Sequence, residues 1–143
     1  MSASGGPGAR ADRLLPTPVG PNAVFYSYLA GGELRLQRCA ACGTWRHPPR
    51  HRCARCGSAD AAWERACGRG RVFSWTLTHQ AVDPAFEPPY AILVVETEEG
   101  PRLVGNLVDG DPSGIALDLP VEIEVEPVSP TVGLVQFRLA RPM

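Results

Sequence analysis

The sequence predicts a mainly-β protein made of an N-terminal helix, a rubredoxin-like zinc ribbon and a five-stranded OB-type barrel. Two observations predict this class: two CxxC pairs lie ten residues apart in the first half of the chain, and segments with strand patterns fill the second half. The length of 143 residues suits one small barrel with an appended module. We expect a tail over 1–20, a helix and ribbon over 21–66 and the barrel over 67–143.

The first twenty residues are rich in Gly, Pro, Ala and Ser and contain no long apolar run. Such a composition buries too little apolar surface to fold, so we expect a disordered tail and not a signal peptide. No apolar run in the chain approaches the ~20 residues that a membrane-spanning helix needs. These features predict a cytoplasmic protein with no membrane partner.

The segment 22–30 predicts a short helix. Asn22 is a capping residue type, aromatic and aliphatic residues follow at helical spacing, and Gly31 and Gly32 end the pattern. A helix of this length is not stable alone in water, so it must pack on the barrel or on a partner protein.

Two short extended segments, 34–38 and 44–45, flank the first CxxC pair and predict a hairpin with two thiols at its tip. The second CxxC pair repeats the tip at 53–56. A glycine follows each pair, at Gly43 and Gly57, because the tight turn around a metal-bound sulfur favours a residue that tolerates positive φ. The two tips together predict a zinc ribbon.

Four cysteines are the predicted metal ligands: Cys39, Cys42, Cys53 and Cys56. In a reducing compartment, paired cysteines favour metal binding over disulfides. Zinc takes four thiolates in a tetrahedron, and a gap of ten residues between the pairs is workable in a rubredoxin-like ribbon. A redox dithiol is the alternative, and iron also fits four thiolates. Since four protein ligands leave no open position, we predict structural Zn²⁺.

Five segments after Gly68 have strand patterns: 71–78, 90–97, 102–108, 121–126 and 134–140. Their number, the turn-rich connections and the lack of a second long helix suit a closed Greek-key barrel better than a sandwich, which has about seven strands. In the last two segments we expect alternate residues to face the core. In the first, Phe73, Trp75 and Leu77 share one face, which predicts core packing. The long loops 81–89 and 109–120 are the candidate functional loops.

The net charge of −1 conceals an uneven distribution. Residues 21–71 contain nine arginines and three acidic residues, whereas residues 72–143 contain three arginines and eleven acidic residues. A basic ribbon on an OB barrel makes a nucleic-acid-binding protein the alternative function. The acidic barrel would repel a phosphate backbone, and four zinc-bound thiolates would reduce the charge of the ribbon by two. Core packing of Phe73 and Trp75 would also leave no base-stacking platform. These arguments disfavour nucleic acid as the partner.

Candidate catalytic residues are few. The sequence contains no phosphate loop, paired-carboxylate motif or GxSxG motif. No recognisable nucleophile-base pattern includes His47, His51 or His79. We expect the side chains of His47 and His51 to be solvated or locally hydrogen-bonded. We expect Cys67 to be a small space-filling residue in the linker. We therefore assign no catalytic and no cofactor-binding residue, and expect no activity of the chain alone.

The ordered motifs resemble the zinc-ribbon/OB-fold proteins associated with acyl-CoA enzymes, a family formerly catalogued as a domain of unknown function. The resemblance covers residues 24–139 or so. It lies in the order of FYSYLAGGEL (25–34), QRCAACG (37–43), HPPR (47–50), CARCGS (53–58), WE (63–64), GRGRV (68–72) and PYA (89–91). Cys67 departs from the small hydroxyl residue expected before Gly68, which does not affect the predicted fold.

Members of this family look like non-catalytic partners of other enzymes. These enzymes are thiolase-fold proteins (thiolases, acyltransferases and steroid side-chain aldolases) or hot-dog-fold enoyl-CoA hydratases. The resemblance implies an accessory subunit that docks on such an enzyme, helps to form its acyl-CoA site and leaves the nucleophile and bases to the partner. It places acyl-CoA at or near the shared interface.

Two questions about this interface stay open in the sequence. The ribbon arginines would bind either the phosphates of CoA or an acidic partner surface. We expect the helix and the ribbon face bearing Trp45 and Arg50 to make the main contact with the enzyme. Alternatively, the helix only caps the barrel.

Overall fold

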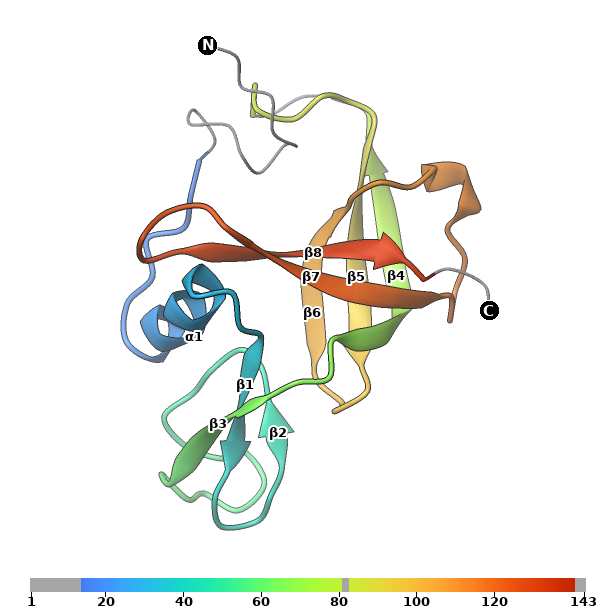
Figure 1. Cartoon of the computed structure of the whole chain (residues 1–143). Helices are drawn as coiled ribbons and strands as arrows, with labels where there is room; N and C mark the ends of the chain where they lie inside the picture. Colours follow the sequence, from blue (N-terminus) through green and yellow to red (C-terminus); the bar gives the residue numbers. More distant parts are fainter. Residues whose placement is uncertain (1–13, 81–82, 141–143) are drawn as a thin grey trace.

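The computed structural model describes residues 14–80 and 83–140. Parts of three sequence predictions lie outside these residues: 1–13 of the tail, 81–82 of the loop 81–89 and 141–143 of the barrel segment. The described chain forms one α-helix, a three-stranded ribbon sheet and a closed five-stranded barrel (Figure 1). The predicted fold class is therefore confirmed. No helix within the described ranges is both long and apolar enough to cross a membrane.

Helix α1 (Pro21–Ala30) begins one residue before the sequence prediction. Gly20, not Asn22, is the N-cap, with φ 61° and no side-chain capping bond. Pro21 occupies the first turn, where its missing N–H costs nothing and its fixed φ suits the helix. At the other end Gly32 has φ 86° and its N–H donates to the Leu29 carbonyl at 2.9 Å, so the predicted glycine stop is confirmed.

Helix α1 packs on the barrel through strands β7 (Pro120–Pro127) and β8 (Gly133–Leu139). Phe25 and Leu29 are 5% and 0% exposed and belong to the core. Gly133 allows the close approach, because a Cβ there would lie 2.3 Å from the backbone carbon of Leu29. Phe25 and Leu29 thus pack into the chain's own core, whereas Val24 is 39% exposed.

The ribbon sheet has the order β2-β1-β3 and both pairings are antiparallel. Its strands are β1 (Arg35–Cys39), β2 (Trp45–Arg46) and β3 (Ala61–Arg65). The sequence pattern did not predict β3, because its residues do not alternate and all but Trp63 are exposed. Pairing with β1 over five residues, from Arg35↔Arg65 to Cys39↔Ala61, makes it a strand.

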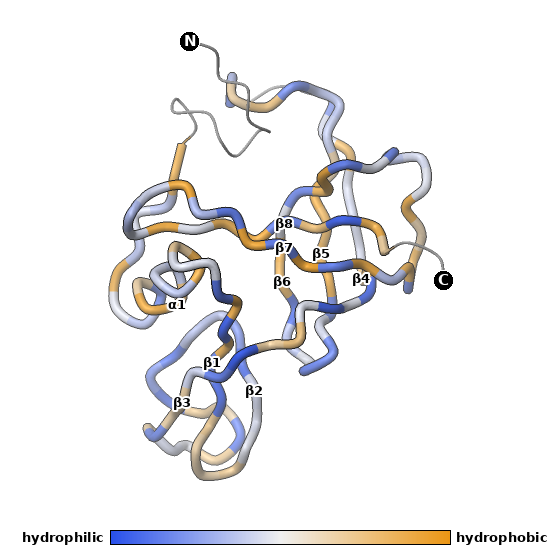
Figure 2. Tube along the Cα trace, viewed as in Figure 1, coloured by the Kyte–Doolittle hydropathy of each residue, from blue (hydrophilic) through white to orange (hydrophobic). Residues whose placement is uncertain are grey.

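The barrel has the strand order β4-β5-β6-β8-β7 and closes between β4 and β7. Its first three strands are β4 (Arg69–Thr78), β5 (Tyr90–Thr97) and β6 (Arg102–Leu107), and the short 3₁₀ helix η2 (Pro112–Gly114) lies in the loop before β7. The fully buried core includes Val72, Leu93, Val95, Leu103, Val121 and Phe137. Figure 2 shows the contrast between the hydrophobic middle of β5 and the hydrophilic ribbon loop 46–52.

The predicted core packing of the Phe73 face is wrong for two of its three residues. A register shift between Val72 and Ser74 interrupts the pairing of β4 with β5, so the alternation expected from the sequence breaks there. Phe73 is 46% exposed and Leu77 is 37% exposed, whereas Trp75 packs against the core. The outer surface of the barrel therefore carries exposed apolar side chains.

Candidate metal centre

The two CxxC segments fold into matching loops at the end of the ribbon. In each loop the N–H of the first cysteine donates to the carbonyl of the residue five positions later, at 2.9 Å. The N–H of the glycine donates to the carbonyl of the first cysteine, also at 2.9 Å. Gly43 and Gly57 have φ values of 80° and 78°, which confirms the reason inferred for a glycine at these positions.

The sulfur atoms of Cys39, Cys42, Cys53 and Cys56 lie within 4.8 Å of one another. The Cys39–Cys56 and Cys42–Cys53 sulfur distances are 3.5 and 3.6 Å. A zinc ion with four Zn–S bonds of about 2.3 Å separates its sulfurs by about 3.8 Å. A disulfide needs about 2.05 Å, and all four thiols are free. The donor set and its spacing fit a tetrahedral metal ion.

Hydrogen bonds favour the thiolate form of Cys39 and Cys42, whereas at Cys56 the lowering effect of the Ser58 backbone is outweighed by the Cys39 sulfur and desolvation, which raise the pKa to about 11. The Cys42 N–H donates to the Cys39 sulfur at 3.4 Å and the Arg55 N–H donates to the Cys53 sulfur at 3.3 Å. The Thr44 hydroxyl lies 3.1 Å from the Cys42 sulfur. This hydroxyl, with the Thr44 backbone, lowers the pKa of Cys42 to about 6, and the Cys42 N–H lowers the pKa of Cys39. Thiolates are the form that binds metals.

Gln37 is a buried polar residue whose role the sequence analysis missed. It is 6% exposed, and its Oε1 accepts hydrogen bonds from Arg46 Nε and from the backbone N–H of Arg50, both at 2.8 Å. The Arg46 guanidinium also donates to the Arg50 carbonyl at 3.1 Å. Gln37 therefore fixes the loop between the two CxxC segments to β1. The only indication of this role in the sequence is a polar residue next to the apolar Leu36.

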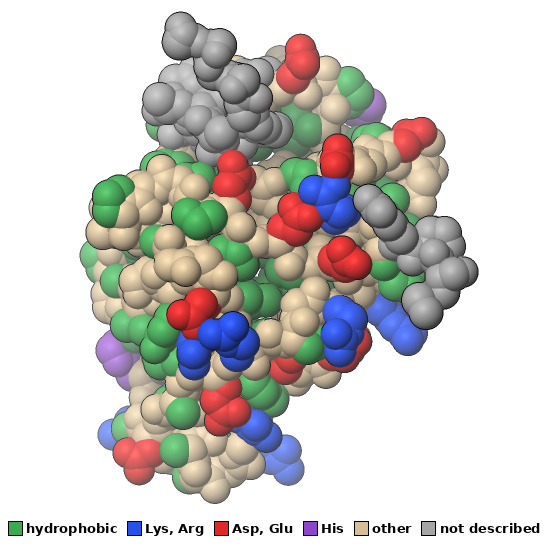
Figure 3. Space-filling model, viewed as in Figure 1, with side chains coloured by type: hydrophobic (Ala, Val, Ile, Leu, Met, Phe, Trp, Pro, Cys, Tyr) green, Lys and Arg blue, Asp and Glu red, His purple; other side chains and the backbone are tan. Residues whose placement is uncertain are grey.

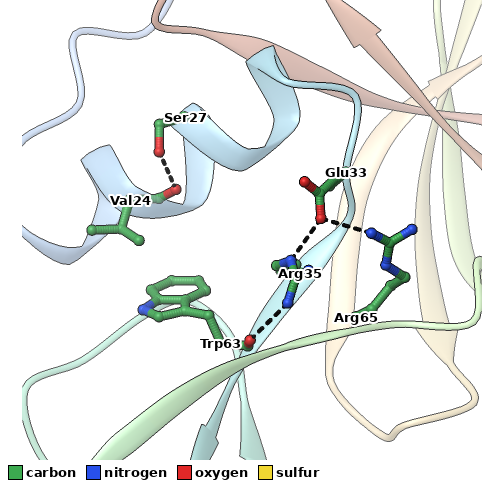
Figure 4. A network of polar contacts seen from close by, with 6 residues as sticks. All are labelled: Val24, Ser27, Glu33, Arg35, Trp63 and Arg65. Atoms are coloured by element: carbon green, nitrogen blue, oxygen red, sulfur yellow. Dashed lines mark hydrogen bonds and ion pairs between the residues drawn. The ribbon is translucent and has the colours of Figure 1, made fainter.

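Ion pairs and ring contacts join β1 to its neighbours. Glu33 accepts hydrogen bonds from Arg35 at 2.7 Å and from Arg65 at 2.9 Å, and Arg35 also donates to the Trp63 carbonyl at 3.2 Å (Figure 4). The Arg35 guanidinium lowers the pKa of Glu33 and lies 5.2 Å from the centre of the Tyr28 ring. These arginines hold the ribbon and helix together.

Further arginines of the ribbon have structural partners as well. Arg38 donates to the Gly43 carbonyl at 2.8 Å and to Glu64 at 3.1 Å, and its guanidinium lies 4.8 Å from the centre of the Trp45 ring. Arg52 donates to a loop carbonyl at 3.0 Å. Most of the arginine side chains in this region therefore form contacts that stabilise the fold.

A cleft of about 650 Å³ lies between the ribbon and the turn that joins β5 to β6. Its lining residues are Cys42, Gly43, Thr44, Trp45, Arg46, His47, Pro48, Arg50, Ala54, Arg55, Glu99, Gly100 and Pro101. The cleft was not predictable from the sequence, because its two walls come from segments about fifty residues apart.

His47 differs from its predicted role. Its ring lies 4.6 Å from the Phe25 ring, and its Nδ1 is enclosed without a hydrogen-bond partner. Burial lowers the pKa of His47 to about 4, so the imidazole is neutral. The expectation of a solvated or hydrogen-bonded side chain is wrong for Nδ1 of His47, since the residue is half-buried against Phe25, whereas His51 is exposed.

Cys67 lies outside the cysteine cluster and is exposed, so it fills no core space. Its N–H donates to Glu99 at 2.7 Å, and its sulfur lies 3.5 Å from Glu98. Desolvation and these carboxylates raise the pKa of Cys67, which makes it a poor nucleophile.

The fold and the four clustered thiols define a class: a zinc-ribbon module joined to an OB-fold barrel. Residues 28–61 match the family described as ChsH2, rubredoxin-like zinc ribbon domain, and residues 63–126 match ChsH2, C-terminal OB-fold domain. The chain belongs to this ChsH2/DUF35 family, and the resemblance seen in the sequence is confirmed.

Three similar proteins are informative. The chain is 42% identical over 133 residues to a probable enoyl-CoA hydratase alpha subunit of Thermomonospora curvata, covering 93% of this chain. It is 36% identical over 108 residues to the 3-oxo-4,17-pregnadiene-20-carboxyl-CoA hydratase alpha subunit of Mycobacterium tuberculosis, covering 76% of this chain. The chain spans only 42% and 34% of the lengths of these two relatives. A chain of the solved Ltp2-ChsH2(DUF35) aldolase is 40% identical, with a TM-score of 0.82, and the match covers 89% of this chain and all of that one.

Proposed function

We propose that this chain is a non-catalytic accessory subunit of an enzyme that processes acyl-CoA. It binds a thiolase-fold enzyme (a thiolase, acyltransferase or steroid side-chain aldolase) or a hot-dog-fold enoyl-CoA hydratase, and helps to form its acyl-CoA site. The family relationship carries the proposal: two relatives are named as alpha subunits of CoA hydratases, and a third belongs to a two-component aldolase.

The polar groups of the chain agree with this role. Catalysis of acyl transfer or hydration needs a nucleophile or base beside donors that stabilise an oxyanion. Among the described residues, His47 is neutral and packed on Phe25, while His51, His79 and Cys67 are exposed and stand in no such grouping. The reacting groups would come from the partner.

The outer face of the barrel is the surface we propose for the partner. Val104 is 63% exposed and Phe73 is 46% exposed. An adjoining groove of about 550 Å³ is lined mostly by apolar residues of α1, β5, β6 and β8, including Ile92 and Val135. A patch of this kind is typical of a protein contact site.

The charge beside Phe73 is already paired, which favours an apolar partner surface. Arg102 reaches across β5 to lie 3.6 Å from the centre of the Phe73 ring, and it pairs with Glu96 at 3.4 Å. This face replaces the helix as the main contact in our proposal, because Phe25 and Leu29 are buried in the core.

The alternative, nucleic-acid binding, has less support. Exposure of Phe73 removes one of the arguments made against it from the sequence, but the guanidinium of Arg102 covers that ring. Figure 3 shows acidic and basic side chains interspersed over the face that it presents, with no continuous basic surface there. A phosphate backbone needs such a surface.

The proposal includes one structural Zn²⁺ held by Cys39, Cys42, Cys53 and Cys56. Four thiolates saturate a tetrahedral ion, so the metal would stabilise the ribbon and take no part in the reaction. It also includes a cytoplasmic location, since a reducing compartment keeps such thiols free for metal binding.

Co-expression tests the subunit role. The tagged chain is expressed with thiolase-like and hydratase-like proteins of its own organism, and the purified complex is quantified. We expect a stoichiometric complex with one of them, and we expect Val104→Asp to reduce its yield by about tenfold, because a charge would be buried in the interface. Leu117→Asp is the matched control, since Leu117 is 65% exposed in the loop before β7.

Two results would contradict this proposal. If neither type of protein co-purifies, the subunit role is wrong. If Val104→Asp forms the complex as well as the wild type, the contact lies on another face.

A further inference from the structure

We propose that the cleft between the ribbon and the barrel binds the phosphate groups of a nucleotide, through the guanidinium groups of Arg50 and Arg55. The identity of the nucleotide, the 3′-phospho-ADP part of coenzyme A, rests on the proposed function. The phosphate chemistry rests on the cleft itself.

The first observation is that two arginines whose side chains have no hydrogen-bond partner in the described chain line this cleft. Six of the nine arginines between residues 21 and 71 donate to carboxylates, amides or carbonyls of the chain: Arg35, Arg38, Arg46, Arg52, Arg65 and Arg69. The side chains of Arg50 and Arg55 have no such partner within the described ranges, and both line the cleft. Their donors are free for a ligand.

The second observation is the charge of the lining. Arg46, Arg50 and Arg55 face one acidic residue, Glu99. The Glu99 carboxylate already accepts the Cys67 N–H at 2.7 Å. Guanidinium groups therefore outnumber carboxylates in the lining, and they bind phosphate oxygens through paired N–H donors.

The third observation is the shape of the cleft and the rigidity of its wall. Its volume of about 650 Å³ lies in the range of sites that hold small ligands. Trp45 also lines the cleft, where its ring is contacted by the guanidinium of Arg38 at 4.8 Å from the ring centre. The backbone N–H of Arg50 is fixed by Gln37 at 2.8 Å, so the guanidinium extends from an ordered loop. These features suit a small ligand that carries phosphate groups.

A competing role for these arginines is to balance the zinc centre. A zinc ion with four thiolates has a formal charge of −2, and Cys42 lines the same cleft. If the arginines served only this purpose, their removal would weaken zinc retention and leave nucleotide binding unaffected. Zinc content therefore has to be measured beside ligand affinity.

The test is calorimetry on the purified, zinc-loaded chain and on its co-purified complex. The ligands are CoA, adenosine 3′,5′-bisphosphate, ADP, pantetheine, inorganic phosphate and a single-stranded oligonucleotide. We expect CoA and the bisphosphate to bind and pantetheine not to bind. The double change Arg50→Ala with Arg55→Ala should weaken binding by about tenfold or more. Arg71→Ala is the control, because Arg71 is exposed and lies outside the cleft lining.

The outcomes separate this inference from the proposed function. If the complex forms but neither it nor the free chain loses affinity for CoA in the double variant, the cleft assignment is overturned and the subunit role stands. If ADP and CoA bind equally well, the cleft takes a nucleotide but not specifically CoA, which overturns the identity. Tighter binding of a single-stranded oligonucleotide than of CoA would overturn the inference in favour of a nucleic-acid site. Lower zinc content with unchanged affinity would assign the arginines to the metal centre.

Discussion

At the scale of single residues, the geometry of the cysteine cluster follows from two repeated turns. Each turn puts two sulfurs on one small loop, and its glycine takes the positive φ that the turn requires. Cys39 and Cys53 are buried while Cys42 and Cys56 are exposed, so the cluster lies at the surface of the ribbon with one side closed. Such an arrangement can hold a metal ion against the small core of the ribbon.

Loss of one ligand should therefore release the metal. We expect the wild-type chain to contain about one zinc, and Cys39→Ser to retain less than about a fifth of it with loss of the ribbon fold, because metal-binding free energy is folding free energy in so small a module. Cys67→Ser is the matched control, since Cys67 is outside the cluster. Elemental analysis measures zinc and iron together. Less than half an equivalent of the two metals in the wild type would refute the assignment.

At the scale of elements, the sequence pattern predicted the barrel strands because alternating apolar residues record which face of a strand is buried. The positions of β5 and β6 agree with the prediction to within one residue. Strand β3 was missed, since an exposed strand has no alternation to detect. Phe73 was misplaced because a bulge in β4 depends on pairing with β5, which a single strand does not encode.

The candidate site likewise has a part that could be predicted from the sequence and a part that could not. The cysteine cluster was predictable, because its spacing is local and its chemistry is specific to cysteine. The cleft was not, because Arg50 and Arg55 look like the other arginines of the ribbon until their lack of partners is seen in three dimensions. His47 was misjudged for the same reason, since its burial depends on Phe25 in the helix.

The contact of α1 with β8 makes a prediction at this scale. Gly133→Ala would place a Cβ 2.3 Å from the Leu29 backbone carbon, so the helix or strand must move. We expect a loss of about 2 to 3 kcal/mol in unfolding free energy, the upper part of the range for overpacking. Gly114→Ala is the control, because its Cβ would meet open space. Denaturant unfolding measures both, and equal midpoints for the two variants would show that the contact is not tight.

At the scale of the whole molecule, the chain combines two modules whose shared boundary carries the features of interest. The cleft lies between ribbon and barrel, and the apolar groove lies between helix, ribbon loop and barrel. The two hydratase relatives are more than twice as long as this chain. Their activities therefore cannot be transferred to the part that this chain shares with them.

We predict that the chain alone has no turnover on acyl-CoA esters. A nucleophile or base must reach the reacting carbon beside donors that stabilise the oxyanion, and the described residues offer neither grouping. His47, with a pKa lowered to about 4, is neutral and packed on Phe25, and Cys67, with a raised pKa, is held as a thiol. Thiolysis, aldol cleavage and hydration are assayed with the purified chain, with the partner alone and with the complex. We expect activity only where the partner is present, with a higher rate in the complex. Turnover by the chain that persists after removal of every trace of partner would mean that it contains a catalytic site of its own.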